Sequence, residues 1–293
     1  MLNVIQARRL QRTSLVYPGK IGAIGALLAI VSVAALANPR FSTLAPGTLR
    51  VGTYFVNPPF EYVSKGEKIG FEVDLMTEIA RRLGLVAVFV NTQWEAILRE
   101  TEEGRYDCIV GGITITPNRE RILAWSIPYM TTTLNLVVNR AKTPAIRTIA
   151  DLKNASVGVQ AATTDYDAAI VMQKQGEIRS VKVYPFDRIE EAMADLEAGK
   201  ITAVMKVAPV AAWLAAKRPN LRIVARVPND PQPLGVGFAK KNSEMVMAVN
   251  RVIATMRWDG SLKRLKEKWS GAGVCVRKAN QPFFMRASSK NDR

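Results

Sequence analysis

The chain has 293 residues, of which 48% are hydrophobic and 23% are charged, and its formal net charge is +16. This composition excludes fibrous and disordered proteins and fits a globular chain with one large core or two modest ones. The sequence has no histidine and two cysteines, which excludes zinc sites, Ser-His-Asp triads and Cys-His pairs. We therefore expect no metal site and no cofactor.

The first 37 residues differ from the rest. Basic residues without any acid come first, then an apolar run at 21–36, which ends in Ala35-Leu36-Ala37. This order is typical of a secretory signal peptide cleaved after Ala37. A membrane anchor is the alternative, but about 16 apolar residues are fewer than the ~20 that span a bilayer. Because no cysteine lies near the cleavage position, we expect a periplasmic product without a lipid anchor.

The net charge falls from +16 to +12 without the four basic residues of this leader. A basic chain can bind nucleic acid or a membrane surface. Here, however, cations such as Arg81-Arg82 and Lys263-Arg264 are spread along the chain and interleaved with acids, as on solvated helix faces. We expect no nucleic-acid partner.

The two cysteines, Cys108 and Cys275, lie far apart in the sequence. An exported chain could join them in a disulfide. Alternatively Cys108, within the run Cys108-Ile109-Val110, is a buried small hydrophobic residue. The sequence leaves both possibilities open.

From Thr48 onward, short apolar runs alternate with amphipathic segments, which predicts an α/β fold with largely parallel sheets. The expected strands are 49–53, 86–90, 106–110, 134–138, 156–159, 181–184, 203–205, 221–225 and 236–239. Apolar stripes predict helices after Gly70 and over 189–196. Residues 276–293 lack such a pattern, and we expect them to form a mobile C-terminal tail.

The segment 104–121 is the most informative one for function. An apolar strand leads into Gly111-Gly112, where missing side chains would let a ligand approach the backbone. Thr116-Pro117 then provides a helix N-cap with proline at the first helical position. Arg119 is thereby placed in the first turn of that helix.

A set of short motifs extends over roughly 49–269. It comprises Gly70-Phe71-Glu72-Val73-Asp74-Leu75, Gly104-x-Tyr106-Asp107, Thr114-x-Thr116-x-x-Arg119, Trp125-Ser126-x-Pro128-Tyr129, Val157-Gly158-Val159 with Thr163-Thr164, and Trp258-x-Gly260. In this order and spacing the chain resembles the extracellular solute-binding proteins of polar amino-acid ABC importers.

The resemblance implies a two-lobed type II periplasmic-binding-protein fold, in which the lobes close on a ligand in the cleft. Each lobe would be a mainly parallel sheet flanked by helices. Lobe 1 would comprise 48–131 and 235–275, and lobe 2 would comprise 132–234. The implied function is that of a monomeric carrier that delivers a small carboxylate-bearing solute, an amino acid or related organic acid, to membrane permease subunits.

The resemblance also implies where a ligand binds. Arg119 matches the arginine that clamps the ligand's α-carboxylate, and a guanidinium can pair with a carboxylate through two hydrogen bonds. Gly112 and Thr114 match positions that add a backbone donor and a hydroxyl. Thr164 would open a helix beginning at Asp165 and present N–H groups to an anion, or it would simply cap that helix.

Aromatic residues are expected around the ligand. Trp94 matches a wall of the family's pocket, and Tyr54, Asn57 and Phe60 fall in a loop that packs on the ligand. Each aromatic side chain could equally belong to a lobe core.

The chain departs from the family where a strand usually ends in the aspartate that pairs with the ligand's α-ammonium. Here Val207 occupies that position and Lys206 precedes it. An unpaired buried ammonium costs several kcal/mol. Either the ligand lacks the amine and Lys206 meets a second anionic group, or another acid replaces the aspartate: Asp165, Asp187 or Glu61. Lys206 could also be a lysine that extends from a strand end to solvent.

Two other functions are possible for such a chain. The sequence is also similar to periplasmic cyclohexadienyl dehydratases, which act on prephenate or arogenate and need a proton donor beside the leaving hydroxyl. The corresponding stretch, 207–210, offers no transferable proton, so we expect a binding protein and not an enzyme. A sensory receptor would have to signal through a partner.

Overall fold

The computed structural model describes residues 41–270, except the side chains of 229 and 230. The predicted signal peptide at 1–37, the predicted tail at 276–293 and Cys275 lie outside the described residues. No helix within 41–270 is long and apolar enough to cross a membrane.

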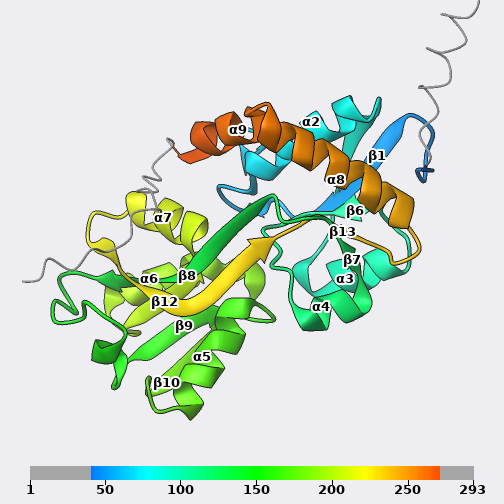
Figure 1. Ribbon diagram of the computed structural model, residues 1–293. Coiled ribbons are helices and arrows are strands. Elements are labelled where there is room, and N and C mark those ends of the chain that lie inside the picture. Colours follow the sequence, from blue (N-terminus) through cyan, green and yellow to red (C-terminus); the bar gives the residue numbers. More distant parts are fainter. Residues whose placement is uncertain (1–40, 271–293) are drawn as a thin grey trace, which may run out of the picture. The chain divides into compact units, whose positions relative to one another are not determined.

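The first lobe is a five-stranded sheet with helices packed against it (Figure 1). The strand order is β5-β1-β6-β13-β7, and a small separate sheet, β2-β3-β4, follows β1 in the chain. The strands are β1 (Thr48–Thr53), β2 (Val56–Asn57), β3 (Glu61–Ser64), β4 (Glu67–Ile69), β5 (Val86–Asn91), β6 (Cys108–Ile109), β7 (Ala124–Trp125) and β13 (Gly237–Phe238). The helices are α2 (Phe71–Arg82), α3 (Trp94–Glu102), α4 (Pro117–Ile122), α8 (Ser243–Trp258) and α9 (Ser261–Ser270).

The second lobe is another five-stranded sheet, with the strand order β10-β9-β11-β8-β12. Its strands are β8 (Met130–Asn139), β9 (Ser156–Gln160), β10 (Ser180–Tyr184), β11 (Ala203–Val207) and β12 (Leu221–Leu234). Its helices are α5 (Thr164–Lys174), α6 (Ile189–Ala198) and α7 (Ala208–Ala216), with the 3-10 turns η1 (Ala150–Leu152) and η2 (Phe186–Arg188).

The predicted alternation of strands and helices is present, but both sheets are mixed and not mainly parallel. In the first lobe β13 runs antiparallel to β6 and β7, and in the second lobe β8 runs antiparallel to β11 and β12. The expected strands at 106–110 and 236–239 shrink to two residues each, while β12 extends to Leu234. The reversed strands, β8 and β13, each follow another strand directly, with no helix in between.

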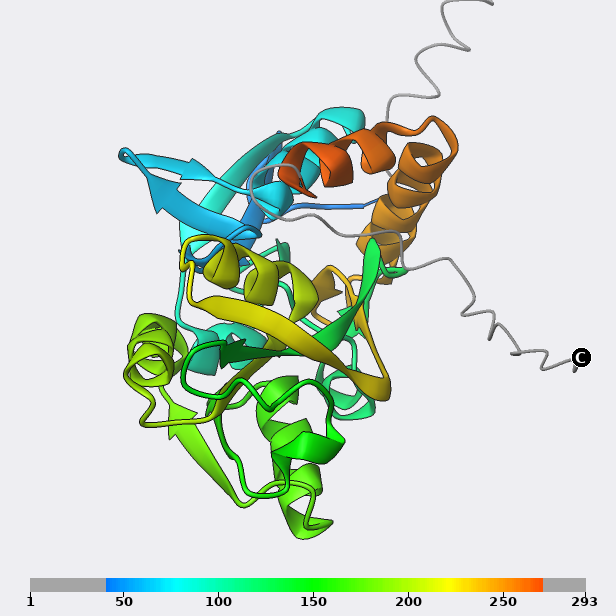
Figure 2. The same ribbon diagram turned by 90° about the vertical axis from the view of Figure 1, so that its left-hand side faces the viewer.

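The two lobes are joined where β8 begins and β12 ends, and there the two strands pair with each other. Met130 pairs with Leu234, Thr131 with Pro233 and Thr132 with Gln232. Both views show the green β8 beside the yellow β12 (Figure 1 and Figure 2). Strand β12 lies at the edge of the sheet, and prolines, which lack a backbone N–H donor, are tolerated in edge strands.

Helix α2 shows how the sequence sets local structure. Its apolar stripe, including Phe71, Leu75 and Ile79, is buried, as predicted from the spacing. Gly70 precedes it at φ 146°, in tight contact with the Phe60 backbone, where a side chain has no room.

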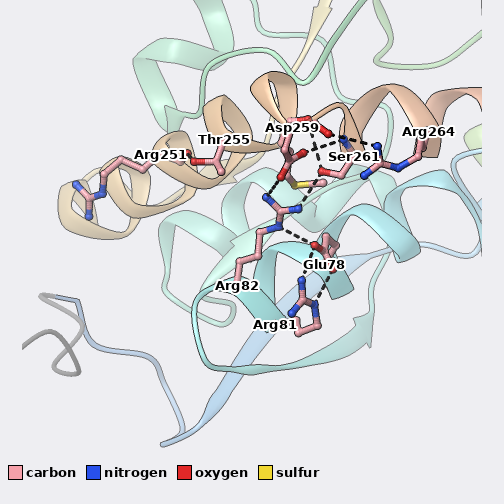
Figure 3. A network of polar contacts seen from close by, with 9 residues as sticks. Glu78, Arg81, Arg82, Arg251, Thr255, Asp259, Ser261 and Arg264 are labelled. Carbon is pink, nitrogen blue, oxygen red and sulfur yellow. Dashed lines mark hydrogen bonds and ion pairs between the residues drawn. The ribbon is translucent and has the colours of Figure 1, made fainter. Parts of the chain in front are cut away.

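An ion-pair network on the far side of the first lobe ties α2 to the turn between α8 and α9 (Figure 3). Arg82 contacts Glu78 at 2.6 Å and Asp259 at 2.7 Å, and it donates to the Ser261 hydroxyl at 3.0 Å. Hydrogen bonds from Arg81 and Arg82 lower the pKa of Glu78 to about 2. The network stabilises the packing of these helices, and none of its residues lines the cavity between the lobes.

Cys108 in β6 is fully buried and forms no disulfide with any residue within 41–270. Its environment is therefore that of a buried small hydrophobic residue. Burial also raises the pKa of this thiol well above its usual value, because the thiolate would lose its hydration.

Candidate functional site

A narrow cavity lies where the two lobes meet, and residues from both of them line it. All of the predicted ligand-binding residues except Phe60 are among its lining: Tyr54, Asn57, Trp94, Gly111, Gly112, Thr114, Arg119, Thr163, Thr164, Asp165, Phe186, Lys206 and Val207. The free volume is about 20 Å³. A single water needs about 10–15 Å³ by this measure, so the side chains nearly fill the space.

Phe60 lies in the hydrophobic core of the first lobe and not against the cavity. It is 1% exposed, and its ring meets that of Phe71 at 6.3 Å. The expectation that it contacts the ligand is not supported by this position. Asp187, one of the acids considered as a replacement for the missing aspartate, is exposed and does not line the cavity either.

The Gly111-Gly112 loop packs closely against side chains of the first lobe. Gly112 has φ 61°, and a Cβ there would lie 3.0 Å from Phe60 and 3.1 Å from the Asn57 amide. The carbonyl of Gly111 accepts hydrogen bonds from the Tyr54 hydroxyl and, at 3.4 Å, from Asn57. The expected ligand donor, the Gly112 N–H, instead donates to the Glu72 carboxylate at 2.9 Å.

Behind this loop, two fully buried glutamates face each other. Glu72 accepts hydrogen bonds from the Gly112 N–H and the Tyr129 hydroxyl. Both carboxyl oxygens of Glu61 are buried without a hydrogen-bond partner, yet Glu72 is within hydrogen-bonding reach. Burial and the neighbouring Glu72 raise the pKa of Glu61 well above its usual value. A proton held by Glu61 and donated to Glu72 satisfies both groups.

Arg119 lies in the first turn of α4, positioned by the Thr116 cap as predicted. Its guanidinium donates to the Thr114 carbonyl at 2.9 Å and to the Ala162 carbonyl of the second lobe at 3.4 Å. It also lies 5.2 Å from the centre of the Trp94 ring. Burial lowers the pKa of Arg119 from its usual value. Within residues 41–270 no carboxylate forms an ion pair with it.

The helix of the second lobe that faces the cavity begins one residue earlier than predicted. Thr163, and not Thr164, caps α5: its hydroxyl oxygen accepts from the Tyr166 N–H at 3.3 Å. The hydroxyl of Thr164 makes no hydrogen bond within the described part of the chain. Of two adjacent threonines, either fits the capping pattern, and only the backbone decides which one caps. Thr164 therefore keeps its hydroxyl available in the cavity.

Lys206 and Asp165 form a buried ion pair. The Lys206 ammonium lies 3.2 Å and 3.4 Å from the two carboxylate oxygens, and the side chains are 4% and 2% exposed. Lys206 does not extend to solvent, so that reading of the sequence was wrong. Each of the two groups considered for ligand recognition neutralises the other.

Three aromatic rings meet at the cavity, and one of them was missed in the sequence. Tyr54 and Trp94 come from the first lobe, whereas Phe186 comes from η2 of the second. The buried Trp94 indole N–H has no acceptor within the described residues. Phe186 stands alone between a predicted strand and a predicted helix, and nothing local in the sequence connects it with the other two rings.

No group of three or more His, Cys, Asp or Glu side chains within 41–270 is arranged to hold a metal ion.

The cavity lies between two lobes, and its lining includes a guanidinium and other hydrogen-bond donors. The sequence profile described as "Bacterial extracellular solute-binding proteins, family 3" matches residues 49–272. The chain belongs to this family. It is therefore a solute-binding protein, and its two-lobed α/β fold is that of its relatives.

Among curated relatives, the L-cystine-binding protein TcyJ of Escherichia coli (strain K12) is 31% identical over 260 residues, which cover 85% of this chain and 96% of TcyJ. The ABC transporter arginine-binding protein 1 of the same organism is 26% identical, over 82% of this chain and 98% of its own length.

Solved structures with the same fold and more than 30% identity include two ancestral proteins. An ancestral arginine-binding protein bound to arginine has a TM-score of 0.70 and 31% identity, covering 77% of this chain and 99% of its own. The ancestral amino acid-binding protein AncCDT-1, described as a precursor of cyclohexadienyl dehydratase, has a TM-score of 0.67 and 32% identity, covering 76% and 95%.

Protonation of Glu61 should make the free energy of unfolding depend on pH. Because the pKa of Glu61 is higher in the folded than in the unfolded chain, its contribution is present below the unfolded pKa of about 4.3 and is lost as pH rises through the folded pKa. Glu61→Gln keeps a neutral donor at every pH. We expect denaturant unfolding between about pH 5 and pH 9 to show falling stability for the wild type and a flatter profile for the variant.

Glu95→Gln, on the exposed face of α3, is the matched control and should follow the wild-type profile. Parallel profiles for the wild type and Glu61→Gln would show that Glu61 is not protonated in the folded chain.

Proposed function

We propose that this chain is the periplasmic substrate-binding component of an ABC importer that captures a small carboxylate-bearing solute and delivers it to a membrane permease. It would be exported by residues 1–37 and work as a monomer. Residues 48–131 and 235–275 would form one lobe, and residues 132–234 would form the other. The family assignment and the names of the relatives support this role.

The observation that carries the proposal is the state of Arg119. A half-buried guanidinium without a carboxylate partner is an uncompensated charge, and its bonds to two carbonyls leave part of its five-donor fork free. The Thr164 hydroxyl and the Trp94 indole N–H line the same cavity without acceptors among the described residues. These donors suit a carboxylate.

The charges around the cavity favour a solute with one net negative charge. Among the side chains that line the cavity, Arg119 and Lys206 carry two positive charges and Asp165 carries one negative charge, so a monoanion makes this lining neutral. Asp167, which lines the adjoining larger cavity, also acts on Arg119. An amino-acid ammonium could reach Asp165 only beside the Lys206 ammonium, where like charges repel. We therefore favour an organic acid without an amine over an ordinary amino acid.

The two lobes would close on the solute because each of them contributes groups to the cavity. Arg119 and Trp94 belong to the first lobe, whereas Thr164 and the Ala162 carbonyl belong to the second. A carboxylate that needs both sets binds the closed arrangement better than an open one and shifts the population toward it.

The first test is Arg119→Ala. Loss of two charge-assisted hydrogen bonds, each contributing about 1.5 kcal/mol or more, should weaken solute binding about 100-fold in isothermal titration calorimetry. The solute for the titration comes from a thermal-shift screen of the chain from Pro39 onward against amino, keto and dicarboxylic acids.

Arg121→Ala is the matched control, because Arg121 lies on the exposed face of the same helix. It should bind as the wild type does. Unchanged affinity in a folded Arg119→Ala protein would remove the proposed anchor.

The second test separates amines from amine-free acids with pyruvate and L-alanine, which differ only at the second carbon. We expect the wild type to bind pyruvate better. In Lys206→Met the Asp165 carboxylate is left free, so the preference should move toward L-alanine, measured by the same titration. Unpaired Asp165 should also lower the stability of the solute-free variant by about 3–5 kcal/mol.

Lys174→Met, at the exposed end of α5, is the control for loss of a lysine. A Lys206→Met protein that keeps the wild-type preference would show that the ion pair does not select the solute.

Enzyme activity is the alternative function, and the similarity to AncCDT-1 is the observation that favours it. The cavity offers few groups that could donate a proton to a leaving hydroxyl. Lys206 is held by Asp165, the Tyr54 hydroxyl donates to Gly111, and Val207 has no proton to transfer. We expect that the purified chain does not convert prephenate. Chromatography of the incubated mixture measures the conversion. Turnover that depends on Arg119 would establish the enzyme.

A further inference from the structure

The ring of Phe186 lies where the second lobe meets two aromatic side chains of the first. It stacks on Trp94 with the ring centroids 4.6 Å apart and an interplanar angle of 16°. It meets Tyr54 edge-on at 4.8 Å, and Tyr54 and Trp94 contact each other at 5.6 Å. Within this cluster of three rings, Phe186 is the contribution of the second lobe.

The backbone holds Phe186 in this position. Its carbonyl accepts a hydrogen bond from the Gln160 side-chain amide, which is itself buried at the end of β9. The Pro185 carbonyl accepts the Arg188 N–H at 3.0 Å and closes the turn around Phe186. The ring is 6% exposed. Phe186 is therefore a fixed part of the cavity wall.

The aromatic cluster lies next to the proposed carboxylate site. The guanidinium carbon of Arg119 is 5.2 Å from the centre of the Trp94 ring, on which Phe186 stacks. A solute whose carboxylate is held by Arg119 therefore meets this cluster with the first few atoms of its chain. The free volume of about 20 Å³ leaves little room before that contact.

We propose that Phe186 is a specificity-determining residue that limits the length of the solute. This inference rests on the proposed carboxylate site. The ring occupies the space beside Tyr54 and Trp94 that the body of a longer acid would need. A longer solute would have to displace Phe186 and break its contacts with both rings, so the wild type selects short acids.

A long solute could also extend away from Phe186. A larger cavity of about 580 Å³ adjoins the site and shares Thr114 and Thr164 with it. A long solute that extends into this cavity would bypass Phe186. The test therefore compares acids that differ in length alone.

The experiment measures binding of pyruvate, 2-oxopentanoate and 2-oxooctanoate by thermal shift and calorimetry. We expect the wild type to bind pyruvate at least tenfold more tightly than 2-oxooctanoate. Phe186→Ala should reduce or reverse this ratio, whereas Phe186→Tyr keeps a ring and should preserve it. Phe89→Ala, which removes a ring packed on Phe55 outside the cavity, is the control and should also preserve it. If Phe186→Ala does not fold, Phe186→Leu replaces it.

Two results would overturn the inference while leaving the carboxylate site intact. The wild type could bind 2-oxooctanoate as tightly as pyruvate, in which case the chain extends elsewhere. Alternatively, Phe186→Ala could keep the wild-type ratio. If neither protein binds any of the three acids, the proposed carboxylate site itself fails and the inference falls with it.

Discussion

The placement of one guanidinium group organises the site. Arg119 donates to a carbonyl of the first lobe, that of Thr114, and to a carbonyl of the second, that of Ala162. Carbonyls satisfy its hydrogen bonds but not its charge, and no carboxylate within 41–270 forms an ion pair with it. The donors and charges around it, including the Asp165 and Lys206 pair, complete one small and positively charged space between the lobes.

Much of the fold could be predicted because its signals are local. Apolar spacing predicted α2, and the Thr116-Pro117 cap predicted the start of α4. The direction of the strands could not be predicted in this way. Strand β13 belongs to the first sheet although it follows the whole second lobe in the chain, and its antiparallel pairing with β6 and β7 depends on that return.

Motifs predicted which residues come together at the cavity, whereas contacts that depend on packing could not be predicted. Phe60 fits a ligand-facing loop by sequence, but the adjacent glycines draw its ring into the core. The roles of Thr163 and Thr164 depend on a helix start that shifts by one residue. The partnership of Lys206 with Asp165, and that of Phe186 with the rings of the first lobe, arises from tertiary contacts alone.

The paired passages between the lobes have a mechanical consequence. Because β8 and β12 are hydrogen-bonded to each other at Met130–Leu234 and Thr132–Gln232, the two connections cannot slide independently. The Ile115 N–H also bonds to Pro233, which fastens the segment leading to Arg119 onto the same ladder. Any rotation between the lobes therefore moves both connections together, and Gln232 of β12 accepts a hydrogen bond from the Thr114 hydroxyl at the site. Such a joint returns the same side chains to the same positions each time, so accurate alignment needs no extensive interface elsewhere.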